Sequence, residues 1–318
     1  MHASPSRNAP CPCGSGKKYK RCCGSGTQAP RTPATPNGQI QQVIGLYQQG
    51  NLQAASRLAE DLLLATPDDA TLLEITAVIA LHTGNPGLAI ERFQQQLVIK
   101  PGNAIAHSNL CMALRMTGDN DTAFQHCQQA ILLDPELEDA WKNLGNLYET
   151  GNPLEKAAEH YDRALAGDDS DPRVHHTTGT VRLKLGELEK AEQHFRNALA
   201  LEPDLAATHN NLGAVLAKEG LHSEAQDAYE QAVQLQPENP EILANYAGLL
   251  IQQDETVKAR QHLEKALSID PNHAGAYINL GILAERQDDT EAVTHNYQHA
   301  LTLDPGNSTV HCNLGYRA

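Results

Sequence analysis

Apolar residues recur at helical spacing through most of the chain. A small residue is followed four positions later by a larger apolar one and three positions after that by alanine, as in Ala191, Phe195 and Ala198. Positions i, i+4 and i+7 fall on one face of an α-helix, so each set predicts an amphipathic helix. The residues that open these sets are Ala89, Ala123, Ala157, Ala191, Ala225, Ala259 and Val293, and alanine closes every set except the first, where Gln96 stands. The pattern predicts an all-α fold.

The same pattern repeats every 34 residues. Prolines keep this period at Pro67, Pro101, Pro135, Pro203, Pro237, Pro271 and Pro305, with Asp169 at the one missing position. Ten residues after each of these eight positions stands a small residue, namely Ala77, Cys111, Gly145, Gly179, Gly213, Ala247, Gly281 and Gly315. A fixed period of this length predicts an array of like units.

Each unit is predicted to be two helices joined by a short turn and closed by a proline-marked stop. Gly186 and Gly220 mark two of these turns, since glycine commonly ends a helix. The small residues let the two helices of a hairpin approach closely. Because one hairpin cannot bury its apolar stripe alone, we expect the hairpins to stack into a solenoid.

The period and segments such as AWKNLGNLYETGNPLEKAAEHYDRAL closely resemble tetratricopeptide repeats. The resemblance covers about residues 36–318. It implies eight full repeats, starting near residues 36, 70, 104, 138, 172, 206, 240 and 274, and the beginning of a ninth. It also implies a superhelical solenoid, which we assign to residues 39–318, and a role in binding other proteins.

Composition agrees with helices and limits the partners. The formal net charge is −15, yet residues 1–38 hold six basic and no acidic side chains. The rest of the chain is therefore strongly acidic and would repel a phosphate backbone, so we do not expect it to bind nucleic acid. No stretch approaches the ~18–20 apolar residues of a membrane helix, and the N-terminus lacks the apolar core of a secretion signal. We expect a cytoplasmic protein outside the membrane.

Asparagines recur two residues before the small positions, on the first helix of the repeats. They are Asn109, Asn143, Asn211, Asn245, Asn279 and Asn313, interrupted by Ile75 and Thr177. Because an amide side chain both donates and accepts hydrogen bonds, a row of them can hold the backbone of an extended peptide. Such a row resembles the repeats that deliver peptides to O-linked N-acetylglucosamine transferases. The alternative is that these asparagines satisfy neighbouring backbone groups inside the array.

Three other residue sets in the repeats are weaker candidates. Lys142 and Asn146 lie one helical turn apart and resemble half of the clamp by which some tetratricopeptide domains hold a C-terminal carboxylate. Recurring histidines, at His107, His175, His209 and His311, lack the spacing of metal ligands, so we expect packing or groove-lining roles. Cys111, Cys127 and Cys312 are expected to be ordinary thiols.

The segment CPCGSGKKYKRCC, residues 11–23, contains the remaining four cysteines. A phosphate-binding loop is excluded because Cys11 stands where its first glycine is needed and Lys18 where its hydroxyl is needed. A redox pair would favour Cys-x-x-Cys beside a strand–helix unit. Two close ligand pairs around a Gly-Ser-Gly turn fit a single Zn²⁺ best, with Cys11, Cys13, Cys22 and Cys23 as a closed, structural ligand set.

This segment also resembles the SEC-C motif, the metal-binding tail of the bacterial preprotein translocase motor. The match covers both cysteine pairs and the Gly-Ser-Gly-Lys-Lys-Tyr-Lys run, although many members end in Cys-His where this chain has Cys22 and Cys23. The resemblance implies a bacterial zinc knuckle, residues 1–24, that docks on other proteins, such as the ribosome or an acidic partner. Residues 25–38, rich in Gly, Pro and Thr, are predicted to be a flexible linker.

Taken together, these patterns predict a protein interaction scaffold and not an enzyme. The solenoid is expected to bind an extended peptide or protein segment, and the knuckle to be a second docking module. The rival hypothesis is the substrate-recruiting front of a longer enzyme, such as an O-linked N-acetylglucosamine transferase or a sulfotransferase, because STVHCNLGYRA stops inside a ninth repeat. An uncapped last repeat predicts either a homodimer or a longer natural chain.

Overall fold

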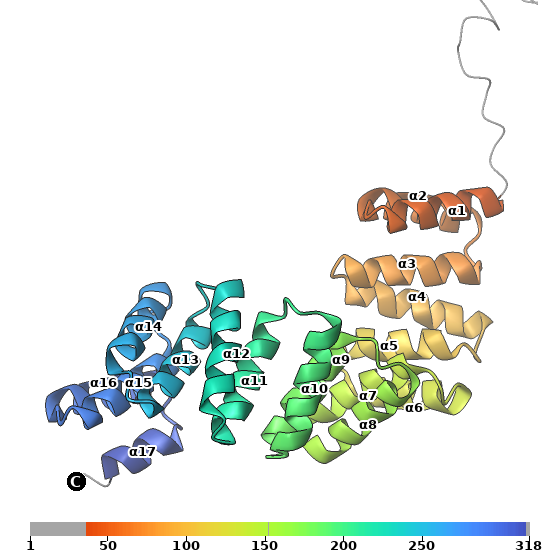
Figure 1. Ribbon diagram of the computed structural model, residues 1–318. Helices are drawn as coiled ribbons and strands as arrows, with labels where there is room; N and C mark the ends of the chain where they lie inside the picture. The colour runs from red at the N-terminus through yellow and green to blue at the C-terminus, as the bar shows by residue number, and fades with distance from the viewer. Residues whose placement is uncertain (1–35, 152, 316–318) are drawn as a thin grey trace, which may run out of the picture. The chain divides into compact units, whose positions relative to one another are not determined.

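The computed structural model describes residues 36–151 and 153–315 (Figure 1). Within these residues the chain forms seventeen α-helices and no β-strand, so the predicted all-α class is confirmed. The odd-numbered helices are α1 (Pro36–Gln48), α3 (Ala70–His82), α5 (Ala104–Thr117), α7 (Glu138–Gly151), α9 (Pro172–Lys184), α11 (Ala206–Lys218), α13 (Pro240–Gln252), α15 (Ala274–Arg286) and α17 (Ser308–Gly315). The even-numbered helices are α2 (Leu52–Ala65), α4 (Pro86–Ile99), α6 (Asn120–Leu133), α8 (Leu154–Gly167), α10 (Leu188–Leu201), α12 (His222–Leu235), α14 (Thr256–Ile269) and α16 (Thr290–Leu303).

The odd-numbered helices begin at the predicted repeat starts, from Pro36 to Ser308, at intervals of 34 residues. Each is the first helix of a repeat, and the following even-numbered helix is the second. Helix α1 begins three residues before the predicted start of the solenoid at residue 39, so the last residues of the predicted linker are helical.

Contacts divide the chain into two units, Met1–Gly102 and Asn103–Ala318. We call them unit 1 and unit 2. The described part of unit 1 holds the hairpins α1/α2 and α3/α4, and that of unit 2 holds α5 to α17. Inside each unit the two helices of a hairpin pack together and each hairpin packs against the next in chain order (Figure 1).

Local capping fixes the start or the end of several helices, although α8, α10, α11, α12 and α14 have no side-chain cap at their N-termini. Asn103 caps α5, its side chain accepting a hydrogen bond from the Ala106 amide, as the preference for Asn at helix starts requires. The turn after α11 passes through Gly220 at φ +79°, a left-handed conformation that glycine adopts without steric cost. Asp254 and Asp288 occupy the same turn position at φ 65° and 56°. The turn thus keeps its positive φ in the two repeats that have aspartate in place of glycine.

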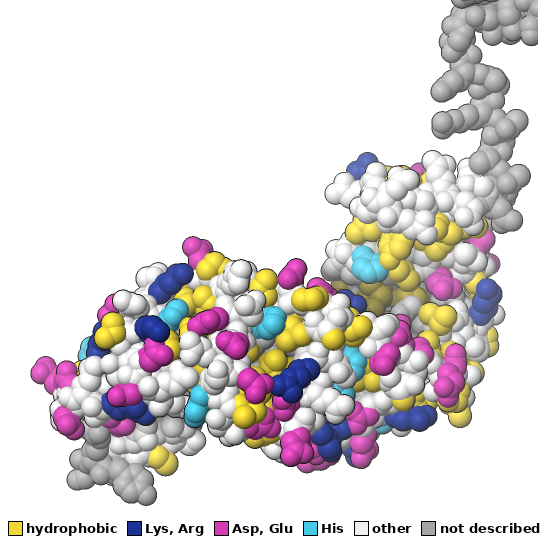
Figure 2. All heavy atoms as spheres, in the orientation of Figure 1, with side chains coloured by type: hydrophobic (Ala, Val, Ile, Leu, Met, Phe, Trp, Pro, Cys, Tyr) yellow, Lys and Arg dark blue, Asp and Glu magenta, His cyan; other side chains and the backbone are white. Residues whose placement is uncertain are grey.

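The core of a typical hairpin is a glycine under an aromatic ring. A Cβ atom placed on Gly179 of α9 would lie 2.7 Å from the ring of Phe195 on α10, and one on Gly145 of α7 would lie equally close to Tyr161 on α8. Phe195 and Tyr161 are fully buried. The small and large positions of the sequence pattern therefore meet inside the hairpin. On the face of unit 2 visible in Figure 2, acidic and basic side chains are interspersed, with hydrophobic side chains in the seams between helices.

Candidate functional site

The recurrent asparagines of unit 2 lie in one row on the odd-numbered helices, from α5 to α17. Five of the six are half-buried, and Asn143 on α7 is buried. The asparagine of one repeat contacts the preceding odd-numbered helix. The asparagines and the side chains beside them therefore form one continuous strip. We call this strip of α5, α7, α9, α11, α13 and α15 the odd-helix face.

The Nδ2 donors of this row bind the preceding repeat. Asn143 donates to the backbone carbonyl of Ser108, at 3.1 Å, and Asn279 donates to the carbonyl of Ala244, at 2.8 Å. Asn245 donates to Oδ1 of Asn210 at 3.1 Å. These bonds join neighbouring hairpins, so the asparagines have the structural role that the sequence left open as an alternative.

The acceptor side of the row differs from one asparagine to the next. Oδ1 of Asn211 accepts a hydrogen bond from Asn210, and Nδ2 of Asn211 donates to Thr180. Oδ1 of Asn245 and Oδ1 of Asn279 accept no hydrogen bond within the described residues. Neither oxygen is among the buried polar atoms without a partner in that part of the chain. These two oxygens can therefore each accept a further hydrogen bond.

The two ends of the row contribute less. Asn313 on α17 donates to the phenolic oxygen of Tyr297 at 3.1 Å. Asn109 on α5 is half-buried. Asn143 is only 4% exposed, so it cannot reach a ligand without a rearrangement of α7. Of the six asparagines only Asn143 is buried, so half-buried amides remain on α5 and on the later repeats.

Lys142 and Asn146 are both engaged inside the protein. The Lys142 ammonium pairs with Asp139 on its own helix and lies 4.0 Å from Asp171. Oδ1 of Asn146 accepts a hydrogen bond from the hydroxyl of Tyr161 at 2.6 Å. Because two carboxylates already surround the lysine, the pair is poorly suited to receive a third from a peptide terminus.

The recurring histidines serve the joints between repeats. Nε2 of His175, His209 and His311 each lies near 3 Å from the backbone carbonyl six residues earlier, which can only accept a hydrogen bond. Trp141 and Tyr277 stand at the same repeat position and donate to the equivalent carbonyl. All five residues thus donate a hydrogen bond from the far end of the side chain to a backbone carbonyl six residues earlier. This agrees with the predicted packing role.

Two of these histidines also pair with a histidine on the second helix of the hairpin. The Nδ1 atoms of His107 and His126 are 2.8 Å apart, and those of His175 and His194 are 3.1 Å apart. One Nδ1 of each pair must donate and the other must accept. The two rings therefore cannot both carry a proton on Nδ1, and at most one of them is the imidazolium cation while the contact lasts. Burial lowers the pKa of His194 and that of His126, and the facing histidine lowers each further.

The hairpin α9/α10 has a charged centre where other repeats are apolar. Arg182 is 8% exposed and donates to Asp162 of α8 and to Glu187 in the turn before α10. The Arg182 position carries Leu or Tyr in most other repeats of unit 2. Sequence reasoning missed this network, although an arginine at a core position of the repeat was a visible signal.

Cys111 and Cys127 form a disulfide between α5 and α6, so the expectation of ordinary thiols is wrong for these two residues. They occupy the positions that hold glycine and an aromatic residue in the next hairpin. The repeat register alone could have indicated this pairing, because it places the two cysteines at facing positions, where their Sγ atoms are bonded. Cys312 is a free, exposed cysteine.

The predicted zinc ligands Cys11, Cys13, Cys22 and Cys23 lie outside the described residues. Their donor set of four thiols fits Zn²⁺, which prefers four thiolates at a closed structural site. Among residues 36–151 and 153–315 no cluster of three or more His, Cys, Asp or Glu side chains could hold a metal ion. Nor is any described helix long and apolar enough to cross a membrane.

Family comparison covers both parts of the chain. The family described as tetratricopeptide repeat matches residues 40–104 and 112–172. The tetratricopeptide domain family of the cytochrome c-type biogenesis protein H matches residues 182–311, and the SEC-C motif matches residues 7–25.

The chain is a tetratricopeptide-repeat protein with an N-terminal SEC-C motif. Both resemblances seen in the sequence are thereby confirmed. The SEC-C match overlaps the predicted knuckle and extends one residue beyond it, and the repeat matches cover most of the remaining chain.

Curated relatives match this protein through the SEC-C region. An uncharacterized protein YccF of Bacillus subtilis is 95% identical over 19 residues, which are 6% of this chain and 5% of the relative. A protein translocase subunit SecA of Nitratiruptor is 59% identical over 34 residues, 11% of this chain and 4% of the relative. A UPF0225 protein of Sodalis glossinidius is 77% identical over 22 residues, 7% of this chain and 14% of the relative. The chain thus spans only a small fraction of these relatives.

Solved structures resemble the repeat region. PilF of Pseudomonas aeruginosa superimposes with a TM-score of 0.56 at 24% identity, over 68% of this chain and 97% of that one. The anaphase-promoting complex assembly Cut9–Hcn1 gives a TM-score of 0.62 at 12% identity, over 91% and 57%. YrrB, described as a tetratricopeptide-repeat protein with an unusual peptide-binding site, gives 0.54 at 23% identity, over 59% and 97%. At these identities the likeness establishes the fold alone.

Proposed function

We propose that the odd-helix face of unit 2 binds an extended polypeptide segment through its backbone. The observation that carries this proposal is the pair of acceptor oxygens on Asn245 and Asn279, in neighbouring repeats. Stacked helices are about 8–10 Å apart and an extended chain advances about 3.3 Å per residue, so successive asparagines would meet every third peptide residue. A backbone N–H of the ligand would donate to each oxygen.

The side chains between the asparagines suit a ligand that is read mainly through its backbone. Ala214, Gly248 and Ile282 stand at one repeat position of α11, α13 and α15, and all three are half-buried. A Cβ on Gly248 would touch only the Asn279 amide, at ordinary contact distance. The small residues Ala214 and Gly248 leave room for a peptide backbone to approach the amide oxygens.

A second part of the proposal concerns the SEC-C knuckle. We propose that Cys11, Cys13, Cys22 and Cys23 hold one structural zinc ion and that the basic knuckle docks on an acidic protein surface or on the ribosome. The donor set, the six basic side chains of residues 1–38 and the SEC-C match support it. The zinc would supply the folding free energy that so short a segment cannot gain from an apolar core.

The rival hypothesis, a substrate-recruiting part of a longer enzyme, gains no support from the matched families, which are repeat and SEC-C families. The binding proposal rests on named atoms and is tested more directly.

The test compares peptide capture by matched variants. An array of random 15-residue peptides would be probed with the full chain and with a variant carrying Asn211→Ala, Asn245→Ala and Asn279→Ala. We expect the variant to lose most captured peptides. A control carrying Asn197→Ala, Gln231→Ala and Gln298→Ala removes three exposed amides from even-numbered helices and should capture the same set.

Folding is checked in parallel, because Asn279 also joins two repeats. Circular dichroism at the assay temperature must show that the triple variant stays helical. Capture that is undiminished in a folded triple variant would refute the proposal.

A further inference from the structure

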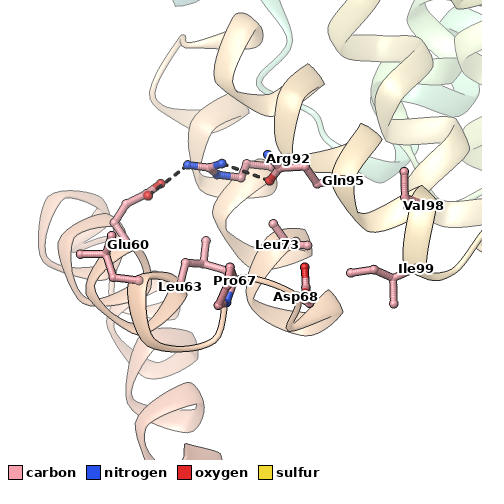
Figure 3. A pocket seen from close by; sticks show the side chains of 10 residues that line it. Glu60, Leu63, Pro67, Asp68, Leu73, Arg92, Gln95, Val98 and Ile99 are labelled. Atoms are coloured by element: carbon pink, nitrogen blue, oxygen red, sulfur yellow. Dashed lines mark hydrogen bonds and ion pairs between the residues drawn. The ribbon is translucent and has the colours of Figure 1, made fainter.

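Unit 1 carries an aliphatic groove between α2 and α4 (Figure 3). The aliphatic residues that line it are Leu63, Leu64, Pro67, Leu73, Val98 and Ile99. The cavity has a volume of about 410 Å³. Leu63 and Leu73 are buried beneath it, whereas Leu64 and Val98 on its two walls are each 85% exposed. No large apolar side chain of the described residues is more exposed than these two.

The exposed aliphatic walls are not required by the repeat. Leu64, Val98 and Leu132 occupy one position near the end of the second helix in the first three repeats. The same position in the five later repeats holds Ala166, Ala200, Gln234, Ser268 and Thr302. Since small or polar residues satisfy the fold there, the apolar residues of unit 1 indicate a surface that is covered by something else.

Charge around the groove selects the partner. Arg92 is already bound, since its guanidinium donates to Glu60 at 3.2 Å and to Gln95 at 3.1 Å (Figure 3). It also pairs with Glu91 at 3.0 Å. Asp61 and Asp68 are exposed beside the aliphatic residues. Residues 36–102 hold six acidic and three basic side chains. A second copy of this chain would bring like charges together, whereas a partner with lysine or arginine would neutralise them.

The groove suits a helix better than an extended segment. Its walls are helices, whose backbone groups are already paired, and no row of amides lines it. An extended peptide would leave its own backbone donors and acceptors unsatisfied against aliphatic side chains. A helix pairs its backbone internally and presents only side chains.

We propose that this groove binds an amphipathic α-helix of another protein, with an aliphatic stripe between Leu64 and Val98 and flanking lysine or arginine near Asp61 and Asp68. This interaction is separate from peptide binding on unit 2. It would give the protein a second docking surface within its repeats.

Fluorescence anisotropy on the full chain tests the proposal with three labelled 18-residue peptides. The first has leucines at i, i+3, i+4 and i+7 spacing with flanking lysines; the second replaces the lysines by glutamates; the third scrambles the leucines. We expect the first to bind and the other two to bind at least about tenfold more weakly. In the variant Leu64→Ser with Val98→Ser, the affinity for the first peptide should fall by about tenfold or more.

Val257→Ser is the matched control, since Val257 is a 71% exposed aliphatic side chain on α14, and it should leave the affinity unchanged. Absence of binding by the first peptide, equal binding of the scrambled peptide, or equal binding by the double-serine variant would each overturn the proposal. A wild-type dimer in sedimentation that the double-serine variant dissociates would also overturn it, by identifying a second copy as the occupant. Unchanged thermal unfolding of the variant excludes misfolding as the cause of lost binding.

Discussion

At the scale of the residue, each hairpin depends on how closely its two helices approach. The pairs Gly145 with Tyr161 and Gly179 with Phe195 place a ring directly over a glycine Cα. The sequence pattern predicted which positions are small and which are large, because the 34-residue period aligns them. The same register sets Cys111 opposite Cys127, but their disulfide was not predicted because both were interpreted as packing thiols.

Replacing Gly179 by alanine is expected to destabilise the protein by about 1–3 kcal/mol, because the new Cβ would overlap the buried Phe195 ring. Urea unfolding followed by circular dichroism measures the effect. Gly248→Ala is the control, since its Cβ would lie 3.6 Å from Asn279 and alanine favours a helix, so its stability should be equal or higher. Equal losses from both substitutions would contradict the close-packing account.

The second prediction concerns the hairpin α5/α6, which carries the disulfide. Cys127→Tyr alone breaks the disulfide and sets a ring against the remaining Cys111 side chain, so it should destabilise strongly. Adding Cys111→Gly recreates the glycine and tyrosine pair of α7 and α8, and should restore much of the loss.

A double-mutant cycle in urea gives the coupling between the two substitutions. We expect the double variant to be more stable than Cys127→Tyr. The reverse order would show that this hairpin does not share the packing of its neighbour.

At the scale of the element, the repeat register was predictable and the special contacts were not. Every odd-numbered helix begins at its predicted residue because the turns and small residues follow one period, as do most capping residues. The charged centre of α9/α10 departs from that period. Its partners Asp162 and Glu187 come from the preceding repeat and from a turn, so only the three-dimensional arrangement shows that Arg182 is paired.

The buried histidines of this hairpin predict a pH dependence. Burial lowers the pKa of His176, and burial together with His175 and Arg182 lowers that of His194 against the opposing effect of Asp162. Folding therefore favours their neutral forms, and the unfolded chain binds more protons. This stability is present above the ordinary histidine pKa of about 6.5 and is lost as pH falls through the lower folded values.

Urea midpoints at pH 7.5 and 5.5 measure this dependence. The decrease between them should be smaller in His194→Gln than in the wild type, and unaltered in His222→Gln, whose side chain is exposed on α12. A decrease of the same size in wild type and His194→Gln would contradict the assignment.

At the scale of the whole molecule, the chain combines an acidic repeat region with a short basic segment. The family matches confirm both parts, and the sequence predicted both because each carries a periodic or densely spaced motif. The division of contacts at Gly102 and the groove of unit 1 were not predictable, since they depend on which surfaces remain uncovered after packing. The cytoplasmic location stays a prediction, and the Cys111–Cys127 disulfide bears against it because such bonds persist mainly in oxidising compartments.

Zinc content tests the N-terminal part of this description. We expect about one zinc ion per chain by elemental analysis, in accordance with a closed four-cysteine site. Cys13→Ser should lose the metal, whereas Cys312→Ser should retain it. Helicity should be the same in both variants, because the described helices begin at Pro36. Zinc retained by Cys13→Ser would contradict the assignment.

The central claim is that unit 2 holds a polypeptide along its odd-numbered helices. Photo-crosslinking of a captured peptide from benzoylphenylalanine placed at Ala214 on α11 or at Gln231 on α12 tests it most directly. The account predicts crosslinks from position 214 and none from position 231. Crosslinks from position 231 alone, or equally from both, would contradict it.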